Sequence, residues 1–259
     1  MSEGTAVAVV TGGASGIGAA CCHELARRGY RVAVADIDEA AAARVASATG
    51  GVAFAVDVAD EASVEDLAGR VERALGPVAA LVNSAGVIQV PLPPETLPLS
   101  SWDHVVRVDQ RGTYLACLAF GRRMAVRGRG AIVNIASIAG MRSMPLHAYA
   151  PAKAAVIAIT ECLAAEWGRS GVRVNAVSPG YTRTPALQAA IDRGQRDVAA
   201  LEQNSALGRL IEPEEIAKAV AFLVSGDAAA ITGVNLPVDG GWLVATSWQT
   251  YKGIPGKRN

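Results

Sequence analysis

Three residues in the second half of the chain, Ser137, Tyr149 and Lys153, have side chains suited to acid–base chemistry. Tyr149 and Lys153 are four positions apart in a helical pattern, so their side chains share one helix face. An ammonium beside a phenol stabilises the phenolate and lowers the tyrosine pKa toward that of a general acid–base. Ser137 follows an apolar strand-like run and can hydrogen-bond a substrate oxygen as charge develops. Because the Tyr–Lys spacing alone often arises by chance, its weight depends on the rest of the chain.

A glycine-rich segment, TGGASGIG at residues 11–18, follows the first apolar run and precedes a helical pattern. Gly12, Gly16 and Gly18 let the turn tighten and the backbone approach a pyrophosphate, which the helix N-terminus then binds through N–H groups and its dipole. An ordinary strand-to-helix turn can have the same residues. Here, however, the preceding strand, the helix and a second strand all stand where the motif requires them. The segment therefore predicts a dinucleotide site.

Asp36 ends the second strand-like run and bears on which dinucleotide binds. A carboxylate there accepts hydrogen bonds from both adenosine ribose hydroxyls and repels a 2′-phosphate. Residues 13–15 and 36–38 include no Arg or Lys that could receive such a phosphate. We therefore expect NAD(H) to be favoured over NADP(H). The alternative for Asp36 is a simple turn former together with Asp38.

Asp109 is an unexpected carboxylate in the largely apolar helical stretch VVRVDQRGTYL, residues 105–115. A carboxylate buried without a partner is costly. Three interpretations stay open from the local sequence: a solvated helix residue, a structural hydrogen-bonder, or part of an active site.

Strand-like apolar runs that alternate with Ala- and Leu-rich helical patterns must position these residues. The runs are 6–10, 31–36, 52–57, 79–83, 131–136, 172–177 and 234–239. Continuously apolar runs are typical of strands buried on both faces of a parallel sheet. The β-α-β-α order predicts an α/β fold, a single-domain Rossmann-type doubly wound sheet of mainly seven parallel strands with helices on both faces. Ligands of such sheets bind outside the carboxyl ends of the strands, where Asp57 and Asn83 also lie.

The composition excludes several classes of partner. The 259 residues are 51% apolar, and 24 Lys plus Arg balance 24 Asp plus Glu, so no net field attracts nucleic acid or an anionic membrane. No apolar run is long enough to span a bilayer, and no leader-like segment opens the chain. The cysteines, Cys21, Cys22, Cys117 and Cys162, are interpreted as buried small hydrophobes in a reducing compartment. The reducing compartment and the absence of a spanning run lead us to expect a cytoplasmic protein. The three His residues lack metal-ligand spacing, so we expect no metal site.

Taken together, these pieces resemble the short-chain dehydrogenase/reductase family over residues 5–242. The matching segments are TGGASGIG (11–18), DV (57–58), NSAG (83–86), the Ser137, Tyr149 and Lys153 set, NAVSPGYTRTP (175–185) and the stretch 208–241. The resemblance implies that Tyr149 exchanges a proton with the substrate while the nicotinamide exchanges a hydride, that Lys153 holds the nicotinamide ribose, and that Ser137 orients the substrate oxygen. The cofactor residues that it implies are Gly12, Ser15, Gly16, Ile17, Gly18, Asp36, Asp57, Val58, Asn83, Ala85, Gly86, Tyr149, Lys153, Pro179, Gly180, Thr182 and Thr184.

The resemblance also makes Asp109 the main departure, because the family usually has Asn there, holding a water that connects Lys153 to solvent. We expect Asp109 to take that relay position as an acceptor and to raise the Tyr149 pKa. The alternative is a structural role without catalytic effect. The resemblance further implies a substrate lid at about 181–212, and a homotetramer in which Trp248 or Tyr251 of the tail 242–259 contacts a partner subunit.

The expected substrate pocket is mostly apolar, with two polar tips. Its residues are Val90, Pro91, Ile138, Met144, His147, Tyr181 and the lid. His147 either touches substrate or caps the helix start. Such a pocket suits a secondary alcohol or ketone that is polyol-, sugar- or cyclic-alcohol-like. The alternatives are an NADPH-dependent carbonyl or 3-oxoacyl-carrier-protein reductase, and a non-catalytic dinucleotide-binding regulator.

Overall fold

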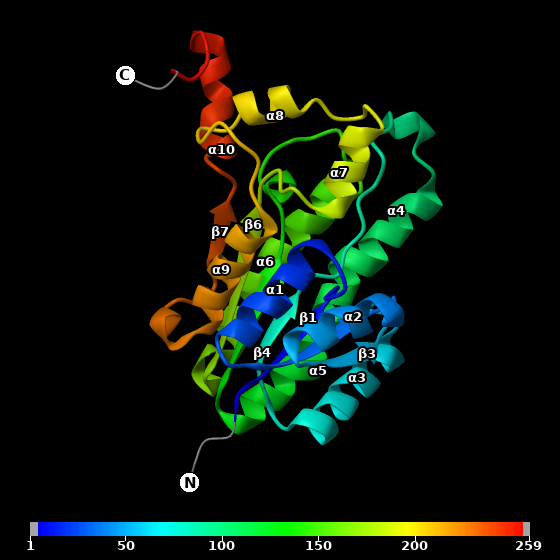
Figure 1. The fold of residues 1–259 in the computed structure, drawn as a ribbon, viewed down its shortest axis with the longest axis vertical. Helices are drawn as coiled ribbons and strands as arrows, with labels where there is room; N and C mark the ends of the chain where they lie inside the picture. The colour runs from blue at the N-terminus through cyan, green and yellow to red at the C-terminus, as the bar shows by residue number, and fades with distance from the viewer. Residues whose placement is uncertain (1–4, 256–259) are drawn as a thin grey trace.

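A seven-stranded parallel sheet forms the centre of the computed structural model, which describes residues 5–255 (Figure 1). The strands are β1 (Val7–Thr11), β2 (Arg31–Asp36), β3 (Val52–Ala55), β4 (Val78–Asn83), β5 (Gly130–Ile135), β6 (Val172–Pro179) and β7 (Asn235–Val238). Their order across the sheet is β3-β2-β1-β4-β5-β6-β7, and every pairing is parallel. The chain reverses its direction of progress between β1 and β4, which is where such sheets open a ligand crevice. This confirms the predicted fold class.

Helices flank the sheet in two layers. They are α1 (Gly16–Arg27), α2 (Glu39–Thr49), α3 (Glu61–Leu75), α4 (Leu99–Val105), α5 (Gly112–Arg127), α6 (Tyr149–Trp167), α7 (Pro185–Asp192), α8 (Val198–Gln203), α9 (Pro213–Val224) and α10 (Trp242–Ala245). A π-helical segment, η2 (Val106–Arg111), joins α4 to α5, and short 3₁₀ turns include Pro94–Thr96, Ile138–Gly140, Gly168–Ser170, Gly226–Ala228 and Thr246–Tyr251. None of the helices in the described residues is long and apolar enough to cross a membrane.

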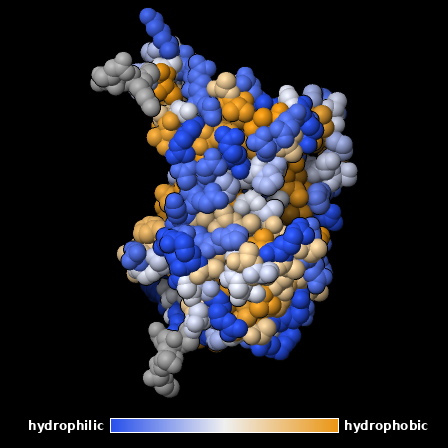
Figure 2. Space-filling model, in the orientation of Figure 1, coloured by the Kyte–Doolittle hydropathy of each residue, from blue (hydrophilic) through white to orange (hydrophobic). Residues whose placement is uncertain are grey.

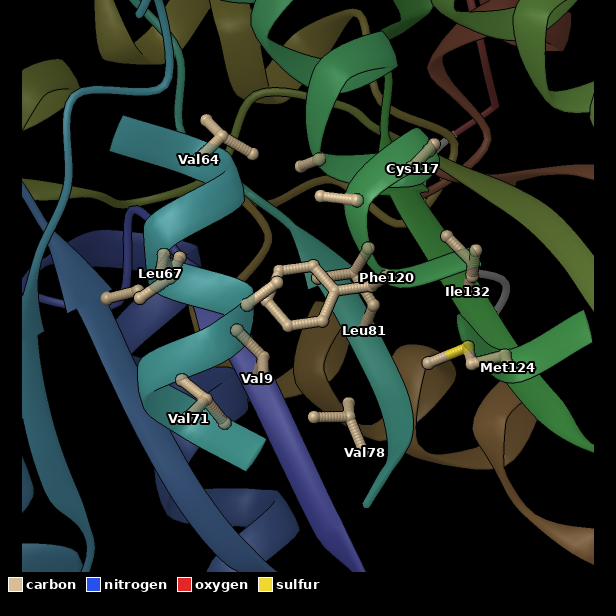
Figure 3. Close-up of a cluster of buried hydrophobic side chains, with 14 of the residues drawn as sticks. Val9, Val64, Leu67, Val71, Val78, Leu81, Cys117, Phe120, Met124 and Ile132 are labelled. Atoms are coloured by element: carbon tan, nitrogen blue, oxygen red, sulfur yellow. The ribbon is translucent and has the colours of Figure 1, made fainter. Parts of the chain in front are cut away.

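The two apolar cores lie on opposite faces of the sheet. Helices α3, α5 and α6 cover one face, and α1, α2 and α9 cover the other. Figure 3 shows Phe120 of α5 between the sheet and the apolar side of α3, which presents Val64, Leu67 and Val71. Alternate residues of β1 point into the two cores, so the strand is apolar along its whole length. This is why continuous apolar runs located the strands correctly.

Two sequence predictions need adjustment at the level of single elements. Strand β3 ends at Ala55, so Asp57 follows the strand by two residues instead of ending it. Cys162 is exposed, whereas the other three cysteines are buried as predicted. The reason is helical periodicity: α6 buries Thr160, Leu163 and Ala164 on one side, and position 162 falls between them on the other.

The segments beyond the carboxyl ends of the strands form the upper part of the molecule (Figure 1). The stretch 181–212, where the resemblance implies a substrate lid, contains the helices α7 and α8. It is tied to the strand-β7 side of the fold, because the Leu207 N–H and the Ser205 hydroxyl both donate to the Gly240 carbonyl at 3.0 Å. Figure 2 shows apolar side chains reaching the surface in this upper region among polar ones; Leu99 and Leu207 are exposed.

Candidate active site

The glycine-rich loop packs so closely that side chains are excluded from it. A Cβ on Gly18 would lie 2.0 Å from the Gly12 carbonyl oxygen, and a Cβ on Gly12 would lie 2.6 Å from the Ala85 backbone. Gly12 also has φ +65°, a backbone conformation that favours glycine. The first turn of α1 therefore packs on Gly12, Gly12 packs on the segment just beyond β4, and Gly16, Ile17 and Gly18 line the crevice. This is the geometry that a pyrophosphate requires.

Asp36 holds the loop from the neighbouring strand. Its Oδ2 accepts the Ala14 N–H at 3.0 Å and its Oδ1 accepts the Asp38 N–H at 3.1 Å. Both bonds use backbone donors, and the carboxylate still borders the crevice together with Ile37. Asp36 therefore forms the turn, as the alternative interpretation expects, and also lies where it could bind a ribose.

A crevice of ≈ 820 Å³ runs along the carboxyl edge of the sheet from the glycine-rich loop to Tyr149 and Lys153. The expected cofactor residues that line it are Gly12, Ser15, Gly16, Ile17, Gly18, Asp36, Asp57, Val58, Ala85, Gly86, Tyr149, Lys153 and Thr184. Residues without a cofactor assignment from the sequence also line it, among them Ile37, Ser84, His104, Arg107 and Pro185. The volume and the loop geometry fit a dinucleotide.

Four residues expected at the cofactor are not among those that line the crevice. Pro179, Gly180 and Thr182 stand outside the crevice lining, and the Thr182 hydroxyl donates to the Gly180 carbonyl at 3.0 Å. Asn83 turns its side chain into the protein, where its Nδ2 donates to Asn134 Oδ1 at 2.8 Å. Asn134 in turn donates to the Thr160 hydroxyl at 2.9 Å. The geometry gives the Asn83 side chain a role in joining β4 to β5 and α6.

The three acid–base residues converge at the far end of this crevice. Tyr149 is the first residue of α6, and Lys153 follows one turn later with its Nζ 5.4 Å from the tyrosine ring centroid. The Ser137 side chain lies just beyond β5, and its oxygen accepts the Ala139 N–H at 3.1 Å. Burial raises the pKa of the Tyr149 phenol above its usual value, Lys153 and Ser137 lower it, and Asp109 raises it, with a net rise. The expected juxtaposition is therefore present.

Asp109 is fully buried beside Lys153. Its Oδ2 lies 3.2 Å from Lys153 Nζ, and its Oδ1 accepts the Val87 N–H at 2.8 Å. Lys153 Nζ also donates to the Ile135 carbonyl at 3.1 Å. Burial alone lowers the pKa of the Lys153 ammonium, but the Asp109 carboxylate and the Tyr149 phenol together raise it above its usual value. The solvated interpretation of Asp109 is therefore wrong.

The backbone around Asp109 is shaped to bring the carboxylate inward. The π-helical segment η2 widens the turn, and such single π turns are frequent at functional sites. The Thr113 hydroxyl donates to the Asp109 carbonyl at 2.7 Å. Gly86 leaves room on the other side, since a Cβ there would lie 3.0 Å from Asp109 Oδ2 and 3.4 Å from Lys153 Nζ.

A second hollow of ≈ 480 Å³ adjoins the crevice and shares Val87, Ile88 and His104 with it. Of the expected substrate residues, Val90 lines this hollow, together with Gln89 and Leu97. Pro91, Ile138, Met144, His147 and Tyr181 line neither space, and Tyr181 packs edge-on against Trp242 with ring centroids 5.8 Å apart.

The start of α6 is capped by a residue that the sequence did not reveal. His147 is exposed, and the N-cap position is Ala148, so the alternative in which His147 caps the helix is wrong. The side-chain amide oxygen of Gln89 instead accepts hydrogen bonds from the N–H groups of Ala148 and Tyr149. Nothing in a sequence links a loop glutamine to a helix about 60 positions away. In the described residues no group of three His, Cys, Asp or Glu side chains could hold a metal ion.

A doubly wound sheet with a dinucleotide crevice that ends in a Ser–Tyr–Lys cluster defines a nucleotide-dependent oxidoreductase. Residues 12–243 match a family model described as enoyl-(acyl carrier protein) reductase. The chain belongs to the short-chain dehydrogenase/reductase family and is an NAD(P)-dependent enzyme acting on CH–OH groups.

Named relatives align over nearly the whole chain. D-threitol dehydrogenase of Mycolicibacterium smegmatis is 43% identical over 92% of this chain and 93% of its own. Cis-4-hydroxycyclohexanecarboxylate dehydrogenase of Sinomonas cyclohexanicum is 42% identical over 91% of this chain and 96% of its own.

Solved structures agree on the fold. A crystal structure described as ribose-5-phosphate isomerase from Brucella melitensis 16M is 56% identical, covers 97% of this chain and 98% of its own, and has a TM-score of 0.96. ElxO with NADP bound is 28% identical over 93% of this chain and 99% of its own, with a TM-score of 0.87.

Proposed function

We propose that this enzyme is an NAD(H)-dependent dehydrogenase of polyol-, sugar- or cyclic-alcohol-like secondary alcohols, with Tyr149 as general acid–base. The observation that carries the proposal is the convergence of Ser137, Tyr149 and Lys153 at the end of the crevice that Asp36 borders. The named relatives, which act on threitol and on a hydroxycyclohexane carboxylate, support this substrate class.

In the proposed reaction, each side chain of the cluster handles the proton or the substrate oxygen. NAD⁺, when bound, accepts a hydride from the alcohol carbon. Tyr149 takes the hydroxyl proton, Ser137 holds the developing carbonyl oxygen, and Lys153 favours the phenolate. Asp109 keeps Lys153 charged and would accept from a relay water, and the carboxylate raises the pKa at which Tyr149 releases its proton. Lys153 would also hold the nicotinamide ribose.

The preference for NAD(H) rests on Asp36. Its carboxylate lies at the crevice, and the cationic residues among the crevice lining are Arg107 and Lys153, of which Lys153 is paired with Asp109. The 28% identical ElxO structure has NADP bound, so the preference of this enzyme is a matter for measurement. We expect kcat/KM with NAD⁺ to exceed kcat/KM with NADP⁺. Asp36→Ala should lower the ratio of these two values. A preference for NADP⁺ in the wild-type enzyme would instead support the carbonyl or 3-oxoacyl-carrier-protein reductase alternative.

The proposed activity is tested by a panel of polyols, sugars, cyclic alcohols and the corresponding ketones, assayed in both directions with both dinucleotides. Wild-type enzyme should turn over at least one polyol or cyclic alcohol, and Tyr149→Phe should lose turnover while it retains NADH binding. Ribose 5-phosphate belongs in the panel because of the 56% identical structure, and we expect no isomerisation of it. Dinucleotide binding without turnover of any substrate would contradict the proposal and favour a regulator.

We also propose a cytoplasmic homotetramer with one domain over residues 1–259, the lid at about 181–212 and the tail 242–259 on a neighbour. Trp248 and Tyr251 support the tail contact, since they are 51% and 81% exposed. Light scattering of the full chain and of a chain lacking 246–259 tests it. A monomer whose activity is unchanged by the deletion would contradict it.

A further inference from the structure

The side chain of Gln89 connects the loop after β4 to the catalytic helix. Gln89 is 5% exposed, and its Oε1 accepts two backbone N–H groups, those of Ala148 and, at 3.1 Å, of Tyr149. Ala148 is the N-cap of α6 and Tyr149 is its first residue. One carbonyl oxygen from a distant loop therefore binds the N–H of the very residue that carries the phenol.

These two N–H groups have no acceptor within their own helix. The first N–H groups of any helix lack an intrahelical partner, and an N-cap Ser, Thr, Asp or Asn side chain satisfies that of the second or third helical residue. In α6 the Ala150 N–H already donates to the Leu146 carbonyl and residue 151 is proline, so the N–H groups of Ala148 and Tyr149 are the ones that need an acceptor from elsewhere. Gln89 is thus the acceptor that holds the start of α6, and with it the root of the Tyr149 side chain.

The rest of the Gln89 amide shows that its orientation is fixed. Its Nε2 is buried without a hydrogen-bond partner. Turning the amide over would place this donor against the two N–H groups, so the oxygen must face them. A buried donor such as Nε2 without an acceptor is unfavourable. A glutamate at position 89 would have no such donor and could still accept the same two N–H bonds. Glutamate, however, would add a negative charge at the first residue of the catalytic helix.

The charge balance around Tyr149 explains why a neutral acceptor is required. Lys153 of α6 and Ser137 favour the phenolate, whereas Asp109 of η2 opposes it. His104 of α4 and Arg107 of η2 line the same crevice. A second carboxylate would oppose the phenolate further.

We propose that Gln89 is a positioning residue that fixes Tyr149 through the backbone while it adds no charge to the acid–base site. The proposal rests on the proposed function of Tyr149 as general acid–base. Gln89 borders the second hollow but not the dinucleotide crevice, so the proposed effect of its backbone hydrogen bonds falls on kcat and on the phenol, not on NADH affinity.

Two substitutions separate position from charge. Gln89→Met removes the acceptor at similar volume; we expect kcat for alcohol oxidation to fall about tenfold, because the phenol is no longer held in its reacting position, with KM and the NADH Kd within about twofold. Gln89→Glu keeps the acceptor; we expect the ultraviolet titration of Tyr149, isolated by subtracting the same variant with Tyr149→Phe, to move up by about one pKa unit. The rising limb of the pH–rate profile for alcohol oxidation should move up with it.

A remote cap serves as the matched control. Ser225 accepts the Asp227 N–H far from the crevice, so Ser225→Ala should lower the melting temperature and leave kcat and the Tyr149 titration unchanged. The proposal is overturned if Gln89→Met lowers only the melting temperature, if it weakens NADH binding as much as kcat, or if Gln89→Glu leaves the titration unmoved. If Gln89→Met does not fold, Gln89→Glu decides alone. The phenol titration needs no turnover, so a wild-type enzyme inactive on every alcohol would refute the proposed function without deciding this point.

Discussion

Replacement of Asp109 by asparagine tests the least usual feature of the site. Asp109→Asn keeps the shape and an acceptor oxygen, but it removes the charge that lies 3.2 Å from Lys153 Nζ inside the protein. An ammonium left without its counter-ion in a buried site typically costs about 3–5 kcal/mol. Because the asparagine oxygen and the Ile135 carbonyl can still accept from Nζ, we expect the lower end, about 3 kcal/mol.

The pH dependence of that loss has a definite sign. The folded-state pKa of Lys153 is raised, so the stabilisation is fully present below its unfolded-state pKa of about 10.4 and is lost as pH rises through the folded-state pKa. The stability difference between wild type and Asp109→Asn should therefore stay constant from neutral to mildly alkaline pH and shrink only above that range. Urea unfolding at several pH values measures it.

The same substitution should shift catalysis to lower pH. Lys153 Nζ lies 3.2 Å from the carboxylate and 5.4 Å from the phenol ring centroid, so carboxylate and ring are within about 9 Å of each other. A unit charge at that separation is worth about 2 kcal/mol at an effective dielectric constant near 20, which corresponds to roughly one and a half pKa units. We expect the rising limb of kcat/KM for alcohol oxidation to move down by about that amount.

An exposed aspartate on the preceding helix provides the control. Asp103→Asn removes the same charge from the surface of α4 and should move neither the stability nor the profile. A pH–rate profile unmoved by Asp109→Asn would refute the electrostatic reasoning and leave Asp109 a structural hydrogen-bonder.

Three further outcomes test the scaffold. Gly18→Ala should abolish measurable NADH binding by fluorescence and lower stability by about 1–3 kcal/mol, because its Cβ would meet a carbonyl oxygen at 2.0 Å; Gly168→Ala, with open space, should do neither. Asn134→Ala should lower the free energy of unfolding, measured in urea, by about 1–3 kcal/mol, because it leaves the buried polar groups of Asn83 and Thr160 without this partner. An unchanged free energy of unfolding would show that the Asn83–Asn134–Thr160 hydrogen bonds do not stabilise the fold. Hydrogen bonding to Arg27 lowers the pKa of Glu24 to about 2, so the carboxylate contributes stability above its usual pKa that is lost as pH falls toward 2. In Glu24→Gln the free energy of unfolding should therefore depend less steeply on pH in that window. A pH dependence equal to that of the wild type would count against the ion pair.

The sequence by itself determined the fold and the nucleotide crevice. Strands buried on both faces are apolar at every position, so runs such as AVAVV locate the sheet without any knowledge of its neighbours. The glycines of 11–18 and the Tyr149–Lys153 spacing are likewise local, because a tight turn and a shared helix face depend only on positions close in the chain. These features were therefore predictable.

Only the tertiary structure decided what the polar side chains do. Asp109 could have been solvated, and its burial against Lys153 depends on how η2 packs against α6. Asn83 ends a strand as predicted, yet its side chain turns to Asn134 because β5 lies beside β4. Gln89 has no sequence signal at all, and it caps α6 only because the loop after β4 passes the start of that helix. Hydrogen bonds and ion pairs act over a few ångströms between residues distant in sequence, so they are set by packing and not by local pattern.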